Sequence, residues 1–266
     1  MKTAFLGIDL QNDFCDQSGS LFVPGSDKDC LRVSDFIRRN KTKINYIGMT
    51  QDSHQIIAIF HPAFWQDVDG NFPPSYTLIL SSDVKSGKWT PRYMPKLALE
   101  YLEKLESQGE FVNVVWPEHC VIGTWGWSFQ KDVMDSLIEW SRIGNFYQVV
   151  QKGQYPLTEH FGAFRANVQY PNEPSTQLNQ GFIHVLEKYD TIYLAGEAKT
   201  HCVANTLKQS FDFPNLVKKI VILQDCMSNV PGGPTPLTTF EEIAQPIYEQ
   251  AKTMGAIFVN STDINL

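Results

Sequence analysis

The sequence predicts an α/β fold built around a mostly parallel sheet. Two observations carry this prediction. Short apolar runs alternate with helical patterns almost throughout the chain, which is typical of parallel strands joined by right-handed crossovers. The length of 266 residues and the 42% hydrophobic content are also enough for one large core. We therefore expect a single domain over residues 1–266.

The strands are predicted from apolar runs of four to six residues that are bounded by turn-forming or charged residues. In chain order, the expected strands cover residues 3–8, 44–49, 111–116, 146–151, 191–195, 219–223 and 256–259.

The helices are predicted from apolar residues at helical spacing and from capping residues at their starts. Ser26 or Asp27 caps the first helix, and Pro174 opens the fourth. The first expected helix runs from this cap to residue 37. The others cover residues 96–106, 129–142, 174–186, 203–207 and 240–254.

Residues 62–95 break this alternation. Proline, glycine, serine and aromatic residues are interleaved there, so we expect a long structured insertion with little regular secondary structure. Loops of such length inside a compact domain commonly serve as lids, binding loops or interface arms.

Composition excludes several classes of partner. The formal net charge is −7 and the chain has no long run of lysine and arginine, so nucleic acid is not an expected partner. No signal peptide and no apolar stretch of membrane-spanning length is found, so we expect a cytoplasmic protein without a membrane partner. Five cysteines, an odd number, predict reduced thiols rather than a disulfide framework.

Cys202 is the expected nucleophile because it follows the predicted strand 191–195 at a strand-to-helix turn. Free backbone N–H groups and the helix dipole at such a turn favour a thiolate and bind an oxyanion. Two other strands end at Asp9 and Lys152, and ligands in open α/β sheets bind beyond the carboxyl ends of strands. A lone cysteine is more often a packing residue, but the three placements together favour one shared site.

A second group has the residue types of a metal site. Asp52 and His54 follow the second strand, His61 comes seven residues later, and His119 follows the strand 111–116. Three imidazoles and a carboxylate suit one divalent ion, with zinc, iron and manganese as candidates. The alternative is a capping aspartate beside surface histidines.

These motifs, in this order, resemble the nicotinamidase and isochorismatase-like cysteine hydrolase superfamily over nearly the whole chain. The motifs that carry the resemblance are Asp9-Leu10-Gln11-Asn12-Asp13-Phe14-Cys15, the Asp52/His54/His61 set, Trp116-Pro117-x-His119-Cys120, Lys152-Gly153 and Gly196-x-Ala198-x-x-His201-Cys202. The two metal-binding motifs are similar to those of the nicotinamidase branch. The resemblance implies a three-layer α/β/α fold with a six-stranded sheet, and a hydrolase that cleaves linear amide C–N bonds in NAD metabolism.

The resemblance also implies roles for single residues. Cys202 would be the nucleophile, Asp9 the general base and Lys152 their electrostatic partner. The turn would hold a cis peptide bond between Glu197 and Ala198. The remaining implied residues are the oxyanion-hole amides of Ala198 and Cys202, the zinc ligands Asp52, His54, His61 and His119, and the pocket residues Phe14, Trp116 and His201.

Departures from the family pattern leave alternatives open. Trp125 and Trp127 stand where smaller residues are usual, which puts two large rings near the metal-bearing strand and predicts a reshaped pocket mouth. The spacing from His54 to His61 is one residue longer than is common. Beside nicotinamide or pyrazinamide, a ureido or carbamoyl compound is an alternative substrate. A non-catalytic member that binds a partner through the insertion is another, and family analogy predicts a homo-oligomer.

Overall fold

A six-stranded parallel sheet forms the centre of the protein in this computed structural model, which describes residues 1–108, 112–233, 235 and 237–266. The strand order is β10-β9-β8-β1-β2-β7, and every neighbouring pair is parallel. The strands are β1 (Thr3–Ile8), β2 (Ile44–Asp52), β7 (Gln148–Lys152), β8 (Thr191–Gly196), β9 (Ile220–Leu223) and β10 (Ile257–Val259). The predicted fold class is confirmed.

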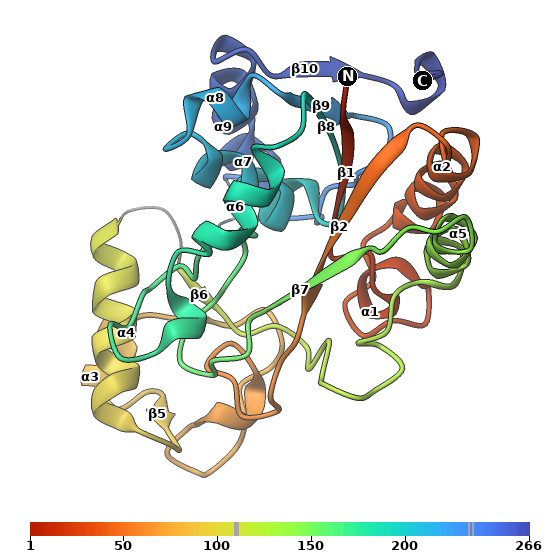
Figure 1. Ribbon diagram of the computed structural model, residues 1–266. Coiled ribbons are helices and arrows are strands. Elements are labelled where there is room, and N and C mark those ends of the chain that lie inside the picture. The colour runs from red at the N-terminus through yellow and green to blue at the C-terminus, as the bar shows by residue number, and fades with distance from the viewer. Residues whose placement is uncertain (109–111, 234, 236) are drawn as a thin grey trace.

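Helices cover both faces of this sheet (Figure 1). On one face lie α1 (Asn12–Cys15), α2 (Ser26–Arg39) and α5 (Lys131–Ser141), and on the other lie α6 (Gln180–Leu186), α7 (Ala204–Ser210), α8 (Pro214–Val217) and α9 (Phe240–Thr253). Successive side chains of a strand point to opposite faces. Accordingly, Phe5 packs in the core with Phe36 of α2, whereas Leu6 packs in the core with Leu207 of α7.

The expected insertion contains several short elements. These are η1 (Pro62–Phe64), β3 (Trp65–Gln66), β4 (Leu78–Ile79), α3 (Ser81–Lys85) and β5 (Thr90–Pro91), followed by α4 (Pro95–Gln108) and β6 (Asn113–Val114). Figure 1 shows α3 beside α4, apart from the main sheet. Trp65 and Tyr101 are fully buried in a third core that lies under these elements.

Two predicted elements differ from the structure. The prediction that a strand over 111–116 belongs to the main sheet is wrong, because β6 pairs antiparallel with β4 instead. The first residue of that predicted strand, Phe111, lies outside the described residues. The helix predicted over 174–186 is divided into η2 (Pro174–Thr176) and α6. Asn179 causes the new start, since its side chain accepts a hydrogen bond from Phe182 N and caps α6. In the described part of the chain, no helix has the length and apolar content needed to cross a membrane.

Candidate active site

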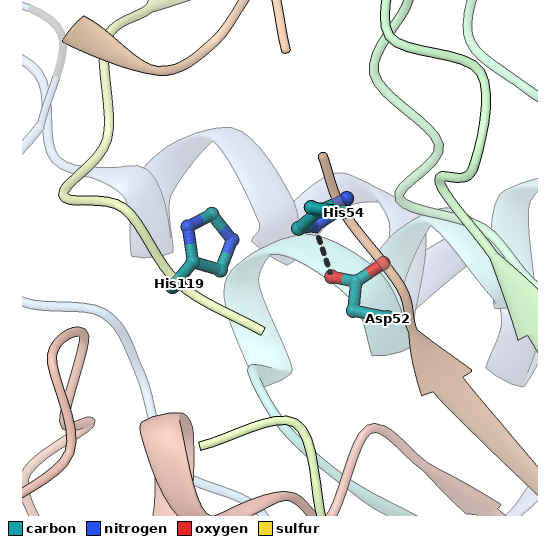
Figure 2. A group of neighbouring side chains, drawn as sticks. All are labelled: Asp52, His54 and His119. Carbon is teal, nitrogen blue, oxygen red and sulfur yellow. Dashed lines mark ion pairs between the residues drawn. The ribbon is translucent and has the colours of Figure 1, made fainter. Parts of the chain in front are cut away.

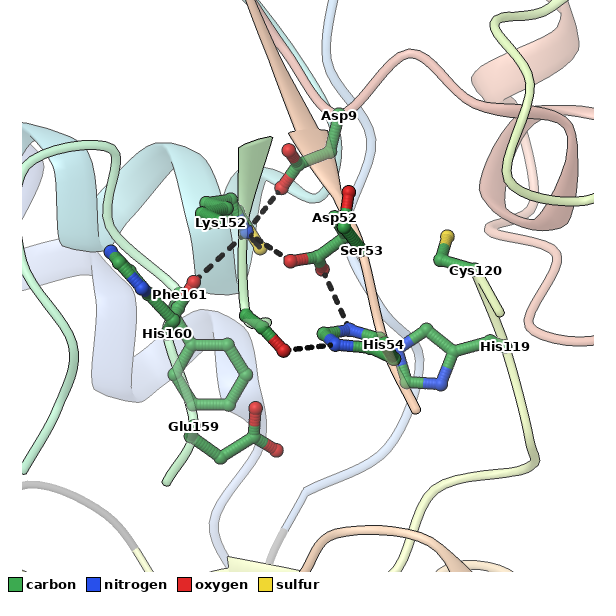
Figure 3. Close-up of polar contacts among 12 residues, drawn as sticks. Asp9, Asp52, Ser53, His54, His119, Cys120, Lys152, Glu159, His160 and Phe161 are labelled. Carbon is green, nitrogen blue, oxygen red and sulfur yellow. Dashed lines mark hydrogen bonds and ion pairs between the residues drawn. The ribbon is translucent and has the colours of Figure 1, made fainter. Parts of the chain in front are cut away.

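The three expected catalytic residues lie together where neighbouring strands end. Strands β8, β1, β2 and β7 are adjacent in the sheet; Asp9 follows β1, Lys152 ends β7, and Cys202 lies in the turn η3 (Lys199–Val203) after β8. Lys152 Nζ lies 2.8 Å from Asp9 Oδ2 and 3.7 Å from Cys202 Sγ. Figure 3 shows the ion pair between Lys152 and Asp9.

Asp9 is held in a conformation that non-glycine residues seldom adopt. Its φ of 46° lies in the left-handed region, and such conformations often occur at functional sites. The Thr50 hydroxyl donates a 2.6 Å hydrogen bond to Asp9 Oδ1, and Asp9 N donates to the same hydroxyl. Burial raises the pKa of Asp9 to about 6, although Lys152 opposes the rise. Asp9 therefore suits a proton acceptor at neutral pH.

Lys152 is a buried cation that several acceptors surround. Its Nζ donates to Asp52 Oδ1 at 2.7 Å and to the His160 carbonyl oxygen at 2.9 Å, in addition to its ion pair with Asp9. Burial lowers the pKa of Lys152, but Asp52 and Asp9 raise it by a larger amount. The net pKa is therefore well above the ordinary value. Lys152 is thus a fixed positive charge rather than a proton donor.

The Cys202 thiol needs a base to become a thiolate, which agrees with the general-base role that the resemblance implies for Asp9. Burial raises the pKa of Cys202 well above its usual range, and this effect exceeds the opposing effect of Lys152. The helix-end argument considered only the local backbone, whereas burial removes the thiol from solvent. Forming the thiolate therefore requires a base at hand.

The turn that presents Cys202 has the backbone features that the resemblance implied. The Glu197–Ala198 peptide bond is cis. Among the residues that the structure describes, no acceptor takes the amide N–H of Ala198. That N–H is free to bind an oxyanion next to the buried Cys202 side chain.

Asp52, His54 and His119 form the expected metal group, which Figure 2 shows. All three are buried, and each offers a ligand atom within 4.8 Å of the other two. Asp52 Oδ2 lies 3.4 Å from His54 Nε2. His61 lies beside this group rather than within it, with Nε2 3.3 Å from His119 Nδ1.

Hydrogen bonds to backbone carbonyls prepare the histidines for a metal. Nδ1 of His54 lies 3.1 Å from the Gly153 carbonyl oxygen, and Nδ1 of His119 lies 2.8 Å from that of Pro117. His61 Nδ1 likewise lies 3.1 Å from the Gln55 carbonyl oxygen. A proton on Nδ1 of His54 and of His119 leaves a lone pair on Nε2 of each ring, which is the arrangement found around metal-binding histidines. Nε2 of His61, in contrast, accepts a 3.4 Å hydrogen bond from His119 N.

The pKa values of the residues in this group shift in different directions. Burial and the neighbouring His54 lower the pKa of His119 to about 4, so its imidazole is neutral at pH 7. Burial raises the pKa of Asp52, but Lys152 and His54 lower it more, so the carboxylate stays ionised. Burial lowers the pKa of His54, but Asp52 raises it by more, so the net pKa of His54 lies above its ordinary value. Carboxylates and imidazoles are both common zinc ligands.

A pocket joins the catalytic and metal groups. Phe14, Trp116 and His201, the predicted pocket residues, all line it together with Cys202, Ala198, Asp52 and His119. The His201 ring lies 5.4 Å from that of Trp116, edge to face. Burial lowers the pKa of His201 to about 4, so it contributes a neutral ring at physiological pH.

Comparisons with known proteins agree with this geometry. No protein-family model matches the sequence. A nicotinamidase of Saccharomyces cerevisiae is 25% identical over 244 residues, which cover 91% of this chain and 94% of that protein. The chain is similar to this nicotinamidase over nearly its whole length. Its fold matches the yeast nicotinamidase bound to the inhibitor nicotinaldehyde, with a TM-score of 0.66 and 20% identity over 97% of this chain and 99% of that one.

A second solved structure has the same fold. The pyrazinamidase of Pyrococcus horikoshii, solved in complex with zinc, has a TM-score of 0.57 and 19% identity over 98% of this chain and 99% of that one. The similarity to a nicotinamidase and the shared fold thus agree with the motifs found in the sequence.

The site contains residues that sequence reasoning missed. Glu159 is buried in the pocket wall and accepts a 2.9 Å hydrogen bond from Trp116 Nε1, and burial raises its pKa to about 8. The carbonyl of His160 and the hydroxyl of Thr50 also hold the catalytic residues. In the sequence, these residues were indicated only by the polar Thr50 beside an apolar run and by the carboxylate of Glu159, seven residues after Lys152.

The two unusual tryptophans do not line the pocket. Trp127 lies near the metal-bearing strand as expected, and its Nε1 donates to the Ser53 hydroxyl at 2.8 Å. Trp125 is 54% exposed. The prediction that these rings reshape the pocket mouth is therefore wrong, because the Trp127 ring is held against Ser53 and that of Trp125 faces solvent.

Proposed function

We propose that the chain hydrolyses nicotinamide to nicotinate and ammonia, and pyrazinamide in the same way, through a thioester at Cys202. The observation that carries this proposal is the position of Lys152 Nζ, 2.8 Å from Asp9 and 3.7 Å from Cys202 Sγ, beside the pocket that Cys202 lines. A nucleophile, a base and a fixed positive charge are thus within reach of one bound amide.

In the first step Asp9 acts as the base. It accepts the Cys202 proton while the sulfur attacks the amide carbon, and the raised pKa of Asp9 brings its basicity closer to neutral pH. Lys152 stabilises the negative charge as it moves from the carboxylate to the sulfur. Burial keeps this ion pair out of bulk solvent. The attraction between Lys152 and a negative charge is therefore stronger than it would be in water.

In the second step the tetrahedral oxyanion collapses. The amide N–H groups of Ala198 and Cys202 are the proposed donors to this oxyanion. Asp9 returns the proton to the leaving nitrogen, so that ammonia departs and a thioester remains on Cys202. Asp9 then accepts a proton from the water that attacks the thioester. As the C–S bond breaks and the acid is released, Asp9 returns this proton to the Cys202 sulfur.

Asp52, His54 and His119 would hold a divalent ion, for which we propose zinc, and His61 is the proposed fourth protein ligand. When bound, the ion would supply a Lewis acid that orients the ring nitrogen of the substrate or a water molecule. Phe14 and Trp116 would flank the aromatic ring of the substrate, and His201 would close the pocket.

The test is ammonia release from nicotinamide by the purified protein. Cys202→Ala should abolish it, while Cys226→Ala, which changes a buried cysteine outside this pocket, should retain it. A panel of pyrazinamide, ureido and carbamoyl compounds tests the alternative substrates. If Cys202→Ala keeps the wild-type rate, the proposed thioester is wrong.

We further propose a cytoplasmic homo-oligomer. The five cysteines are all unpaired in the structure, which suits a reducing compartment. Light scattering of the purified protein would measure its mass in solution, and a monomeric mass would contradict the oligomer.

A further inference from the structure

A second cavity adjoins the pocket of Cys202. This outer cavity has a volume of about 330 Å³, and its lining includes Leu21, Val23, Tyr76, Leu78, Val230 and Phe240. Leu21, Val23 and Val230 also line the pocket that contains Cys202, here called the inner pocket. The two spaces are therefore separated by three apolar side chains that belong to both.

The free space in the inner pocket is much smaller. Its volume is about 30 Å³, which is room for one or two water molecules. The outer cavity, by contrast, has the size of an ordinary small-molecule site. A substrate ring can enter the inner pocket only when its lining side chains rotate, and the outer cavity is the adjoining space with room for a larger group.

Aromatic rings connect the two spaces. The Phe240 ring, which lines the outer cavity, lies 4.6 Å from the His201 ring and 6.3 Å from the Trp116 ring of the inner pocket. Tyr76, on the insertion, lies 6.1 Å from Trp116. No charged side chain lines the outer cavity among the described residues, so it suits an uncharged apolar group.

We propose that the enzyme accepts aromatic carboxamides that carry an apolar substituent on the ring, with this substituent in the outer cavity. The inference rests on the proposed function, since Cys202 fixes the carboxamide in the inner pocket. Leu21, Val23 and Val230 then lie along the substituent, and Tyr76, Leu78 and Phe240 surround its end. These residues determine which amides are preferred.

The test compares nicotinamide with 5-phenylnicotinamide and 6-phenylnicotinamide. We expect at least one phenyl compound to have a kcat/KM no lower than that of nicotinamide. Leu78→Trp fills the outer cavity and should lower the ratio of the two kcat/KM values by at least about tenfold. Leu97→Trp is the matched control, because Leu97 is also a partly buried leucine of the same core but lines neither space; it should leave the ratio unchanged.

A second variant avoids the core. Tyr76 is 58% exposed and has a φ of 69°, which asparagine tolerates, so Tyr76→Asn should fold and should raise KM for the phenyl compound more than for nicotinamide. If nicotinamide is hydrolysed but both phenyl compounds react about 100-fold more slowly, the outer cavity does not bind the substituent. If neither nicotinamide nor the phenyl compounds release ammonia, the proposed function itself fails.

Discussion

Asp52 and Lys152 are register partners at the ends of β2 and β7, and their side chains form a 2.7 Å ion pair. The other Asp52 oxygen faces His54, so one carboxylate contacts both the metal group and the catalytic cation. Since Lys152 also holds Asp9, the charge states of the two groups are coupled through a single buried lysine.

Lys152→Met should abolish activity and destabilise the fold. It would leave the carboxylates of Asp9 and Asp52 buried without their cation, which typically costs about 3–5 kcal/mol. Chemical denaturation measures this cost, and ammonia release should fall by at least roughly 10³-fold. Lys131→Met is the control, because Lys131 is 82% exposed and should change the free energy of unfolding by less than about 0.5 kcal/mol. Equal stabilities of the two variants would contradict the role given to Lys152.

Activity should fall in acid because Asp9 must be ionised to accept a proton. Its pKa of about 6 means that kcat/KM falls as pH drops through that value, by about tenfold per pH unit below it. Thr50→Val removes a hydrogen bond that lowers the Asp9 pKa, so the acidic limb should move to higher pH by about one unit. A limb that stays in place in the Thr50 variant would show that another group controls it.

Removal of the bound metal should lower activity, and zinc should restore it. His119→Ala should weaken metal binding by at least about tenfold, as measured by elemental analysis after dialysis against a chelator series. His61→Ala decides whether His61 is a ligand, because a ligand would show a similar loss and a neighbour would not. His184→Ala, on the exposed side of α6, should retain the metal.

Glu159 should stabilise the pocket through the Trp116 indole. Glu159→Leu leaves the buried Nε1 of Trp116 without its acceptor and should cost about 1–3 kcal/mol of unfolding free energy. Glu159→Gln keeps an oxygen acceptor at the same position and should lose less. Denaturant titration of both variants checks the order, and a more stable leucine variant would contradict it.

The sequence predicted the parts of the site that depend on local pattern and topology. Apolar runs placed Asp9, Lys152 and Cys202 at strand ends, and parallel pairing brings such ends to one edge of a sheet. Contacts between distant segments were not predictable in this way. The Trp116–Glu159 hydrogen bond spans 43 residues, and neither residue's neighbours in the chain indicate the other.

The pairing partner of β6 and the net pKa of Cys202 both depend on long-range packing. The segment of β6 has the composition of a core strand, but it pairs with β4 because the insertion brings β4 alongside it. The turn favours a thiolate at Cys202 through a local dipole, whereas the net rise of the Cys202 pKa follows from burial by the whole fold. Local arguments cannot give the burial that long-range packing produces.

Each of four adjacent strands supplies its own part of the site. The rate of ammonia release therefore depends on the correct register of all four strands. A slip of β7 by one residue would move Lys152 by about 3.3 Å and turn its side chain to the opposite face. Because β7 is an edge strand with one neighbour, β2, its docking is the least constrained of the four. The recovery of ammonia release during refolding would therefore measure when β7 reaches its native register.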